Sequence, residues 1–301
     1  MRYLITGGTG LIGSHFCQSL NADDQVTVLS RTKKPTSSSL KRTECSIRFI
    51  SSLEALSNLN DIDCVINLAG EPIADKRWTK QHKTTLEQSR WETTQALNAL
   101  FKTSSTPPHT FISGSAIGFY GRQGTRPMVE SSTEIHDEFT HRLCSKWESI
   151  ALDVQSPATR VCVLRTGIVL AKEQGALAKM TLPFQLGLGG KIGSGVQGMS
   201  WIHINDMIAG IHHLIQNKHL NGAFNFTAPF PVSNKDFVNE LGHALSRPTL
   251  IPMPAFALRT LMGESADILL TGQFVYPEKL LSSAFKFSYP KLNQALGNLF
   301  D

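Results

Sequence analysis

The sequence is poor in cysteine, in charge and in long apolar runs, and each shortage excludes a class of protein. Five cysteines occur in 301 residues, an odd number without C-x-x-C spacing, which excludes a disulfide scaffold and a cysteine-ligated metal site. No apolar stretch approaches the length of a membrane span, and the first residues lack the features of a leader peptide. We therefore expect a cytoplasmic protein with reduced, buried thiols, no bound metal and no membrane partner.

The charge of the chain is modest and evenly spread. Charged side chains make up 18% of the residues, and 29 basic against 24 acidic residues leave a formal net charge of +5. Because the basic residues are scattered, they do not predict nucleic-acid binding and fit an anionic small molecule equally well. With 41% hydrophobic residues, the chain can bury a large core as one α/β domain or as a nucleotide domain with a smaller partner.

A cluster of glycines directly follows the first apolar segment, in the stretch MRYLITGGTGLIGSHF. The apolar run at 3–6 predicts a buried strand, and the residues after the glycines predict an amphipathic helix. Their spacing fits the dinucleotide fingerprint, in which glycines allow a tight turn and bring a pyrophosphate close to the helix N-terminus. A tight turn alone could also use glycine, so the fingerprint needs a second strand. The candidate binding residues are Gly7, Gly10, Leu11, Ile12 and Gly13.

A second apolar segment at 26–29 follows about twenty residues later, as the fingerprint requires, and it ends in Ser30 and Arg31. NAD enzymes usually place an acidic residue here, because it binds the ribose 2′-hydroxyl. A carboxylate would repel a 2′-phosphate, whereas the guanidinium of Arg31 can stack on adenine and bind phosphate through two parallel hydrogen bonds. The strand end therefore predicts NADP rather than NAD. Lys33 and Lys34 fit a solvated basic loop.

Strand and helix patterns alternate through the first half of the chain, which is typical of a parallel sheet covered by helices. We expect strands at 3–6, 26–29, 47–50, 64–67, 110–113 and 161–165, and helices at 13–20, 53–58, 83–102 and 139–153. These patterns predict an α/β fold with a Rossmann-type doubly wound parallel sheet, helices on both faces, and a smaller C-terminal lobe. We place the NADP-binding domain at 1–166 and a glycine- and proline-rich lobe at 167–301, which forms the substrate cleft and returns segments to the first domain.

One later segment, SWIHINDM, contains a histidine and an aspartate that could suggest a metal site. The alternation of Trp201, His203 and Asn205 instead predicts a strand that enters a helix, with Asp206 as the N-cap. We therefore expect no metal there.

Seven segments together carry a resemblance to a known family. They read TGGTGLIG, INLAGEPIADKRWT, SGSAIGFYG, LRTGIVL, LGLGGKIGSGVQGMSWIHINDM, NGAFNFTAPFPVSNKDF and the proline-rich tail. On these segments the chain resembles the extended short-chain dehydrogenases/reductases, and within them the epimerase family proteins of the YfcH-like branch of the NAD-dependent epimerase/dehydratase superfamily. The resemblance spans essentially the whole chain and implies the Rossmann fold and a nicotinamide dinucleotide.

The resemblance also implies further contacts with the cofactor. The fourth expected strand ends in an N-x-A-G run, where Leu68, Ala69 and Gly70 let backbone groups approach the adenine ribose and the pyrophosphate; a simple turn glycine is the alternative. The family places an arginine facing the nucleotide at Arg90, although a helical arginine is more often a surface residue. It places the loop around Val169 against the nicotinamide carboxamide.

The family's reaction centre is a serine with a Tyr-x-x-x-Lys pair, and this chain lacks the pair. The serine on the fifth strand, which holds the substrate oxygen, is Ser115 here. The tyrosine and lysine need one helical turn between them so that the lysine lowers the phenol pKa, yet the helix reads EFTHRLCSKWESI. Tyr120 is our preferred substitute, ahead of Lys146 and of the loop residues Glu71, Lys76 and Arg77. Alternatively the reaction needs less proton transfer, or the cofactor is bound without turnover.

Two hypotheses for function follow. The first is an NADP(H)-binding oxidoreductase or nucleotide-sugar epimerase-like protein that transfers hydride at a carbonyl or alcohol carbon of a small-molecule substrate, for which the family implies a nucleotide sugar. Lys76, Arg77, Trp78 and Lys191 would face that substrate between the lobes. The second is a non-catalytic NADPH-sensing module that regulates or binds a partner. We expect no nucleic-acid partner, and either a monomer or a homodimer.

Overall fold

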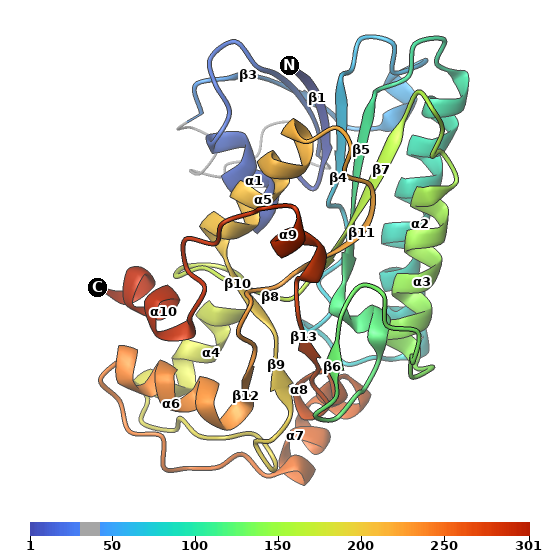
Figure 1. The fold of residues 1–301 in the computed structure, drawn as a ribbon. Coiled ribbons are helices and arrows are strands. Elements are labelled where there is room, and N and C mark those ends of the chain that lie inside the picture. Colours follow the sequence, from blue (N-terminus) through green and yellow to red (C-terminus); the bar gives the residue numbers. More distant parts are fainter. Residues whose placement is uncertain (31–42) are drawn as a thin grey trace.

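A seven-stranded parallel sheet forms the centre of the computed structural model, which describes residues 1–30 and 43–301 (Figure 1). Its strands are β1 (Arg2–Thr6), β2 (Gln25–Leu29), β3 (Ser46–Ile50), β4 (Cys64–Asn67), β5 (Thr110–Ala116), β7 (Arg160–Thr166) and β11 (Gly222–Phe226). They follow the order β11-β7-β5-β4-β1-β2-β3. The direction of winding reverses between β1 and β4, and ligands of such sheets bind outside the carboxyl ends of the strands at that reversal.

Helices cover both faces of the sheet because apolar side chains alternate along its strands. On one face lie α1 (Leu11–Gln18) and α5 (Ile204–Gln216), which pack on a core that includes Ile5, Ile66 and Ile112. On the other face lie α2 (Lys80–Thr103) and α3 (Phe139–Leu152), which pack on a core that includes Leu4, Val65 and Phe111. The predicted doubly wound α/β fold is confirmed.

The expected elements are found with two differences. The segment predicted as a helix at 53–58 is a single 3₁₀ turn, η2 (Leu53–Ala55), so that prediction was wrong. The Ser52 hydroxyl accepts from the Glu54 amide and starts the turn, but Leu56 is already extended and ends it. Strand β11 was not expected from its sequence, although it pairs with β7 along its whole length.

The residues after 166 build a second lobe from short elements and also return to the sheet. Two short elements of the first half touch this lobe, η3 (Ile117–Tyr120) and β6 (Pro127–Met128). The elements of the lobe itself are β8 (Ile168–Leu170), α4 (Gly175–Gln185), β9 (Gly198–Met199), β10 (Trp201–His203), β12 (Val232–Ser233), α6 (Asn234–Ala244), α7 (Ala255–Met262), η4 (Gly263–Ala266), α8 (Asp267–Leu270), β13 (Phe274–Val275), α9 (Glu278–Ser282) and α10 (Leu292–Phe300). Three small strand pairs, β8 with β10, β9 with β12 and β6 with β13, tie these elements together. Figure 1 shows the lobe below the sheet, while α5 and β11 run back to it.

The start of α5 differs from the expected cap. His203 is the N-cap, and its side chain accepts from the Asn205 amide at 3.1 Å. Asp206, predicted as the cap, instead accepts the backbone amides of Ser288 at 2.8 Å and Tyr289 at 2.9 Å. It is 1% exposed, and burial raises the pKa of its carboxyl. Asp206 therefore fastens the C-terminal segment to α5.

All five cysteines lie in the described part of the chain, and each is buried and free. No helix of the described residues is long and apolar enough to cross a membrane.

Candidate functional site

The glycine loop between β1 and α1 is shaped by backbone contacts that no larger residue permits. Gly7 has a φ of +72°, and a Cβ there would lie 2.6 Å from the carbonyl carbon of Leu68. A Cβ at Gly13 would lie 2.4 Å from the Gly7 carbonyl oxygen, so α1 packs directly on the loop. The N-cap of α1 is Gly10, which brings no side chain to the first amides of the helix. Those amides and the helix dipole are thus available to an anion such as a pyrophosphate.

A cavity of about 920 Å³ opens beside this loop, outside the carboxyl ends of β1, β2, β3 and β4. This volume is within the range of small-molecule and cofactor sites. The predicted residues that line it are Gly7, Gly10, Ser30, Leu68, Ala69 and Gly70. The structure thus brings together the glycine loop, the end of β2 and the N-x-A-G run at the winding reversal. Arg31 lies outside the described residues.

The far wall of the cavity was missed by sequence reasoning. It consists of the segment after β3, with Ser51 and Ser52, and of a stripe along α2 with Thr93 and Ala96. Small residues let a flat ring approach a helix closely. The signal in the sequence was the recurrence of small side chains three and four residues apart along α2, from Ser89 through Thr93 and Ala96 to Ala99 and Thr103.

Arg90 also lies on α2 and packs against Gly70, but it is not among the residues that line the cavity. Its guanidinium donates to the carbonyl oxygens of Leu86 and Glu71, each at 3.0 Å. Burial lowers the pKa of Arg90. The arginine thus holds the chain that follows β4 in place, and its cation has no carboxylate within ion-pair distance in the described part of the structure.

The other predicted cofactor residues lie at the opposite end of the glycine loop, where the two lobes meet. Leu11, Ile12 and Val169 are half-buried and pack on the core under α1 and α5. The start of α4 lies beside them, because a Cβ at Gly175 would be 2.8 Å from Leu11 Cδ2 and 3.9 Å from the Val169 carbonyl oxygen. The predicted nicotinamide contact at Val169 therefore adjoins the first turn of α1.

A buried hydrogen-bonded network crosses the end of the sheet on the α3 face. Ser115 donates to Glu148 at 2.6 Å, and Arg165 donates to both Glu148 oxygens at 2.9 Å. Arg165 also donates to the Tyr120 oxygen at 3.1 Å, and Tyr120 donates to Asn225 at 2.7 Å. Strand register explains the row, since Ser115 pairs with Arg165 and Arg165 with Asn225. Both predicted catalytic residues therefore belong to one network.

The environment of this network sets its proton chemistry. Tyr120 is fully buried, and burial raises the pKa of its phenol despite the nearby Arg165 cation. Burial also lowers the pKa of the Arg165 guanidinium, but its hydrogen bonds and ion pair with Glu148 outweigh this and raise it overall. At neutral pH the network holds a neutral phenol beside a cation. It favours fixed geometry over proton exchange with solvent.

The face of α3 that points to the end of β5 carries no tyrosine and no lysine. A Cβ at Gly118 would lie 3.1 Å from Thr140 Cβ and 3.7 Å from Cys144 Sγ, and Glu148 is the next residue on the same face. Thr140 and Cys144 thus stand one helical turn apart where an acid–base pair would face the strand. Burial raises the pKa of Cys144 to about 11. Lys146 points elsewhere, with its ammonium 4.2 Å from the centre of the Trp91 ring.

The loop after β4 connects the sheet to the second lobe by polar contacts. Arg77 donates to the carbonyl oxygens of Thr260 and Leu261 at the end of α7, and Asp75 pairs with Lys179 of α4. The Trp78 indole donates to the Ile73 carbonyl at 2.9 Å within the loop itself. Of the residues expected to face a substrate, Arg77 and Trp78 are thus engaged with backbone carbonyls, and Lys191 is exposed beside Met253 in the second lobe.

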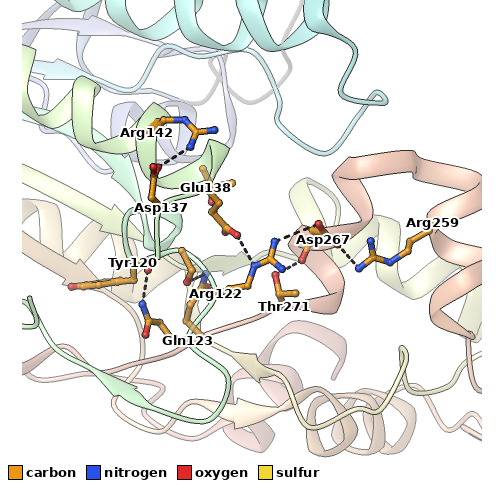
Figure 2. Close-up of polar contacts among 12 residues, drawn as sticks. Tyr120, Arg122, Gln123, Asp137, Glu138, Arg142, Arg259, Asp267 and Thr271 are labelled. Atoms are coloured by element: carbon orange, nitrogen blue, oxygen red, sulfur yellow. Dashed lines mark hydrogen bonds and ion pairs between the residues drawn. The ribbon is translucent and has the colours of Figure 1, made fainter. Parts of the chain in front are cut away.

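A chain of ion pairs makes a second connection between the lobes, and Figure 2 shows it. Arg122 lies between Glu138 at 2.9 Å and Asp267 at 3.7 Å, and Asp267 also pairs with Arg259 at 2.8 Å. Arg122 and Glu138 come from the segment between β5 and α3, whereas the other two residues come from α7 and α8. Ion pairs therefore join the segment from α7 to α8 to the first lobe.

Comparison with known proteins identifies relatives along the whole chain. Residues 3–226 match the NAD dependent epimerase/dehydratase family, and residues 253–299 match a domain of unknown function, DUF1731. An epimerase family protein of Staphylococcus saprophyticus is 38% identical over 300 residues, covering 99% of this chain and 98% of the relative.

Solved structures agree with this relationship. The crystal structure of human epimerase family protein SDR39U1 (isoform2) with NADPH superposes with a TM-score of 0.89 at 35% identity, covering 99% of both chains. A UDP-glucuronic acid 4-epimerase from Bacillus cereus in complex with NAD has a TM-score of 0.78 at 20% identity, covering 100% of this chain and 96% of the other. The second likeness is one of fold.

Proposed function

Because the chain belongs to the NAD-dependent epimerase/dehydratase family, we propose that it binds NADP(H) in the cavity beside the glycine loop and transfers hydride at a carbonyl or alcohol carbon of a small molecule. The observation that carries the proposal is the cavity of about 920 Å³ at the winding reversal, with Gly7 and Gly13 packed so tightly that only glycine fits. When bound, the cofactor supplies or accepts the hydride. The chain itself binds the pyrophosphate at the start of α1 and shapes the cavity through Arg90.

The preference for NADP rests on the end of β2. Ser30 lines the cavity, and Arg31 follows it where an acidic residue would favour NAD. The crystal structure of the human relative with NADPH supports the same choice. We expect Arg31→Ala to lower the ratio of NADPH to NADH affinity, measured by fluorescence titration, while Lys33→Ala leaves it unchanged. An unchanged ratio in Arg31→Ala means that Arg31 does not select the cofactor.

We propose Ser115 and Tyr120 as the residues that act where hydride is transferred. In this proposal Ser115, whose hydroxyl is held by Glu148, lies at the end of β5 and orients the substrate oxygen. Tyr120 positions Arg165, which donates a hydrogen bond to the tyrosine oxygen. The proposed substrate is a nucleotide sugar, in keeping with the family to which the chain belongs. Purified protein with NADP(H) and a panel of nucleotide sugars tests this directly, with new epimers or keto-sugars sought by mass spectrometry.

A second function is supported by the face of α3 that points to β5. With Thr140 and Cys144 in place of a tyrosine and a lysine, the protein has no neutral-pH acid–base pair at that position. A module that binds NADPH without turnover, and presents its bound state to a partner, needs none. The same cavity serves both functions, so the two differ in turnover and not in binding.

The deciding experiment follows deuterium from the transferable C4 position of NADPH. Wild-type protein and Ser115→Ala, both first shown to bind NADPH, are incubated with a metabolite extract, and the label is traced by mass spectrometry. Label that enters a metabolite with wild type but not with the variant supports the enzyme. Tight NADPH binding without label transfer supports the sensing module. Failure to bind either NADPH or NADH refutes the cofactor proposal itself.

A further inference from the structure

An unusual number of large apolar side chains are exposed on the outer edge of the second lobe. In the two segments 175–197 and 245–263, nine such side chains are exposed, and we call these the apolar edge. They are Leu182, Leu186, Leu188, Val196, Leu250, Ile251, Met253, Phe256 and Leu261. Leu250 is 82% exposed and Phe256 is 74% exposed. Soluble monomers seldom expose a contiguous apolar patch of this kind unless it contacts something.

Backbone pairing brings the two segments together. Met253 donates to the Lys191 carbonyl at 2.9 Å, and Gly193 donates to the Met253 carbonyl at 2.9 Å. Nearer to α4, Ile251 donates to the Gly189 carbonyl at 3.3 Å. Figure 1 shows both segments running side by side along the lower edge of the molecule, from α4 and α6 toward α7. Residues about sixty positions apart therefore form one surface.

The helices at either end of this edge continue it. Leu182 of α4 and Leu186, the C-cap residue of that helix, are about one turn apart and exposed, while Phe184 is buried on the other side. Helix α7 has the sequence AFALRTLM, yet only Leu258 is buried in it. An apolar helix with a single buried residue leaves most of its apolar surface without an intramolecular partner.

The charges of the apolar edge have one sign. The two segments contain four basic residues, Lys179, Lys191, Arg247 and Arg259, and no acidic residue. All four are exposed. Lys191 and Arg247 form no ion pair within the described chain, whereas Lys179 and Arg259 pair with Asp75 and Asp267. Exposed leucine and phenylalanine side chains among basic residues are the composition of surfaces that lie in the interface of an anionic bilayer.

We propose that the apolar edge docks the protein on an anionic lipid surface. Leu250, Phe256 and their apolar neighbours enter the boundary between headgroups and acyl chains, and Lys191 and Arg247 contact the anionic headgroups. A second copy of the chain fits this edge less well, because a symmetric contact would bring two basic rims together. The docking is peripheral and needs no spanning helix, but it departs from the expectation that the protein has no membrane partner. It also leaves the cofactor cavity, which lies beside the sheet, open to solvent.

The test is flotation of the full-length protein with vesicles of phosphatidylcholine alone and of phosphatidylcholine with phosphatidylglycerol. We expect binding to the anionic vesicles only, with affinity that falls as salt is raised, since surface charge is screened. Leu250→Ser with Phe256→Ser should weaken binding about tenfold or more, because two apolar side chains no longer enter the interface. Lys191→Glu with Arg247→Glu should abolish the preference for anionic lipid.

Leu281→Ser is the matched control, because Leu281 is 48% exposed on α9, away from the apolar edge. It should float like wild type. NADPH binding and circular dichroism of every variant report folding independently of lipid. Absence of binding to both vesicles, or equal binding of wild type and Leu250→Ser with Phe256→Ser, overturns the proposal. A wild-type dimer in sedimentation that this double variant dissociates would assign the edge to a second copy instead.

Discussion

Removing the carboxylate of Glu148 should destabilise the protein more than any surface substitution. The side chains of Glu148 and Arg165 are 6% and 8% exposed, and two hydrogen bonds of 2.9 Å join them. Glu148→Ala leaves the Arg165 cation buried without its counter-ion and removes the acceptor of Ser115. Breaking a buried pair from one side typically costs about 3–5 kcal/mol. At roughly 2 °C for each kcal/mol in a chain of this size, we expect the melting temperature to fall by about 6–10 °C.

Thermal unfolding followed by circular dichroism measures this shift, and Asp137→Ala provides the matched control. Asp137 pairs with Arg142 (Figure 2) at 2.8 Å, but their side chains are 73% and 59% exposed. Such a pair contributes at most about 1 kcal/mol, so the control should melt within about 2 °C of wild type. Glu148→Leu with Arg165→Met should melt above Glu148→Ala, because neither charge is then buried alone. If Glu148→Ala melts like Asp137→Ala, the pair does not fix this part of the sheet.

Three further predictions follow from single sites. Gly7→Ala should abolish NADPH binding in a fluorescence titration, because its Cβ would lie 2.6 Å from the Leu68 backbone, and normal affinity would refute the glycine-loop site. Burial lowers the pKa of His203 to about 4, so the stability it contributes is present above its unfolded pKa of about 6.5 and is lost as pH falls toward 4. Urea unfolding between those pH values should show that the free energy of unfolding falls with pH in wild type and falls less in His203→Asn, which keeps a capping side chain. An equal fall in both proteins would contradict the role of His203. All five thiols are buried, so Ellman's reagent should react only after denaturation, and rapid reaction of the native protein would show that the thiols are accessible.

Much of the sheet could be predicted because its signals are local. Apolar runs bounded by glycine, proline and polar residues mark strands, and the first six strands of the sheet lie within about two or three residues of their expected bounds. Strand β11 was missed because GAFNF is short and gains its partners only from β7, more than fifty residues earlier. The prediction of a helix at 53–58 was wrong for a similar reason, because a contact with a distant segment decides the structure there. The apolar residues of this segment pack under α2 as a turn.

The cofactor cavity was predicted in part. The glycine loop, Ser30 and the N-x-A-G run each follow a strand, and parallel strands bring their carboxyl ends to one edge of the sheet. The wall formed by α2 was missed because a helix face is assigned to a cavity only when its packing is known. Helix α2 carries the small residues Thr93 and Ala96 on that face.

The sequence by itself determined six of the seven strands of the sheet, the position of the glycine loop and the absence of a Tyr-x-x-x-Lys pair, because each depends on residues close together in the chain. Only the tertiary structure decided what surrounds Ser115 and Tyr120. Strand register and the face of α3 bring them to Glu148 and Arg165, which lie up to 50 residues away from them. The apolar edge arose in the same way, since its residues are unremarkable along the chain and form a surface only where 189–193 and 251–253 pair. Contacts between distant segments depend on the packing of the whole molecule, and no local pattern specifies them.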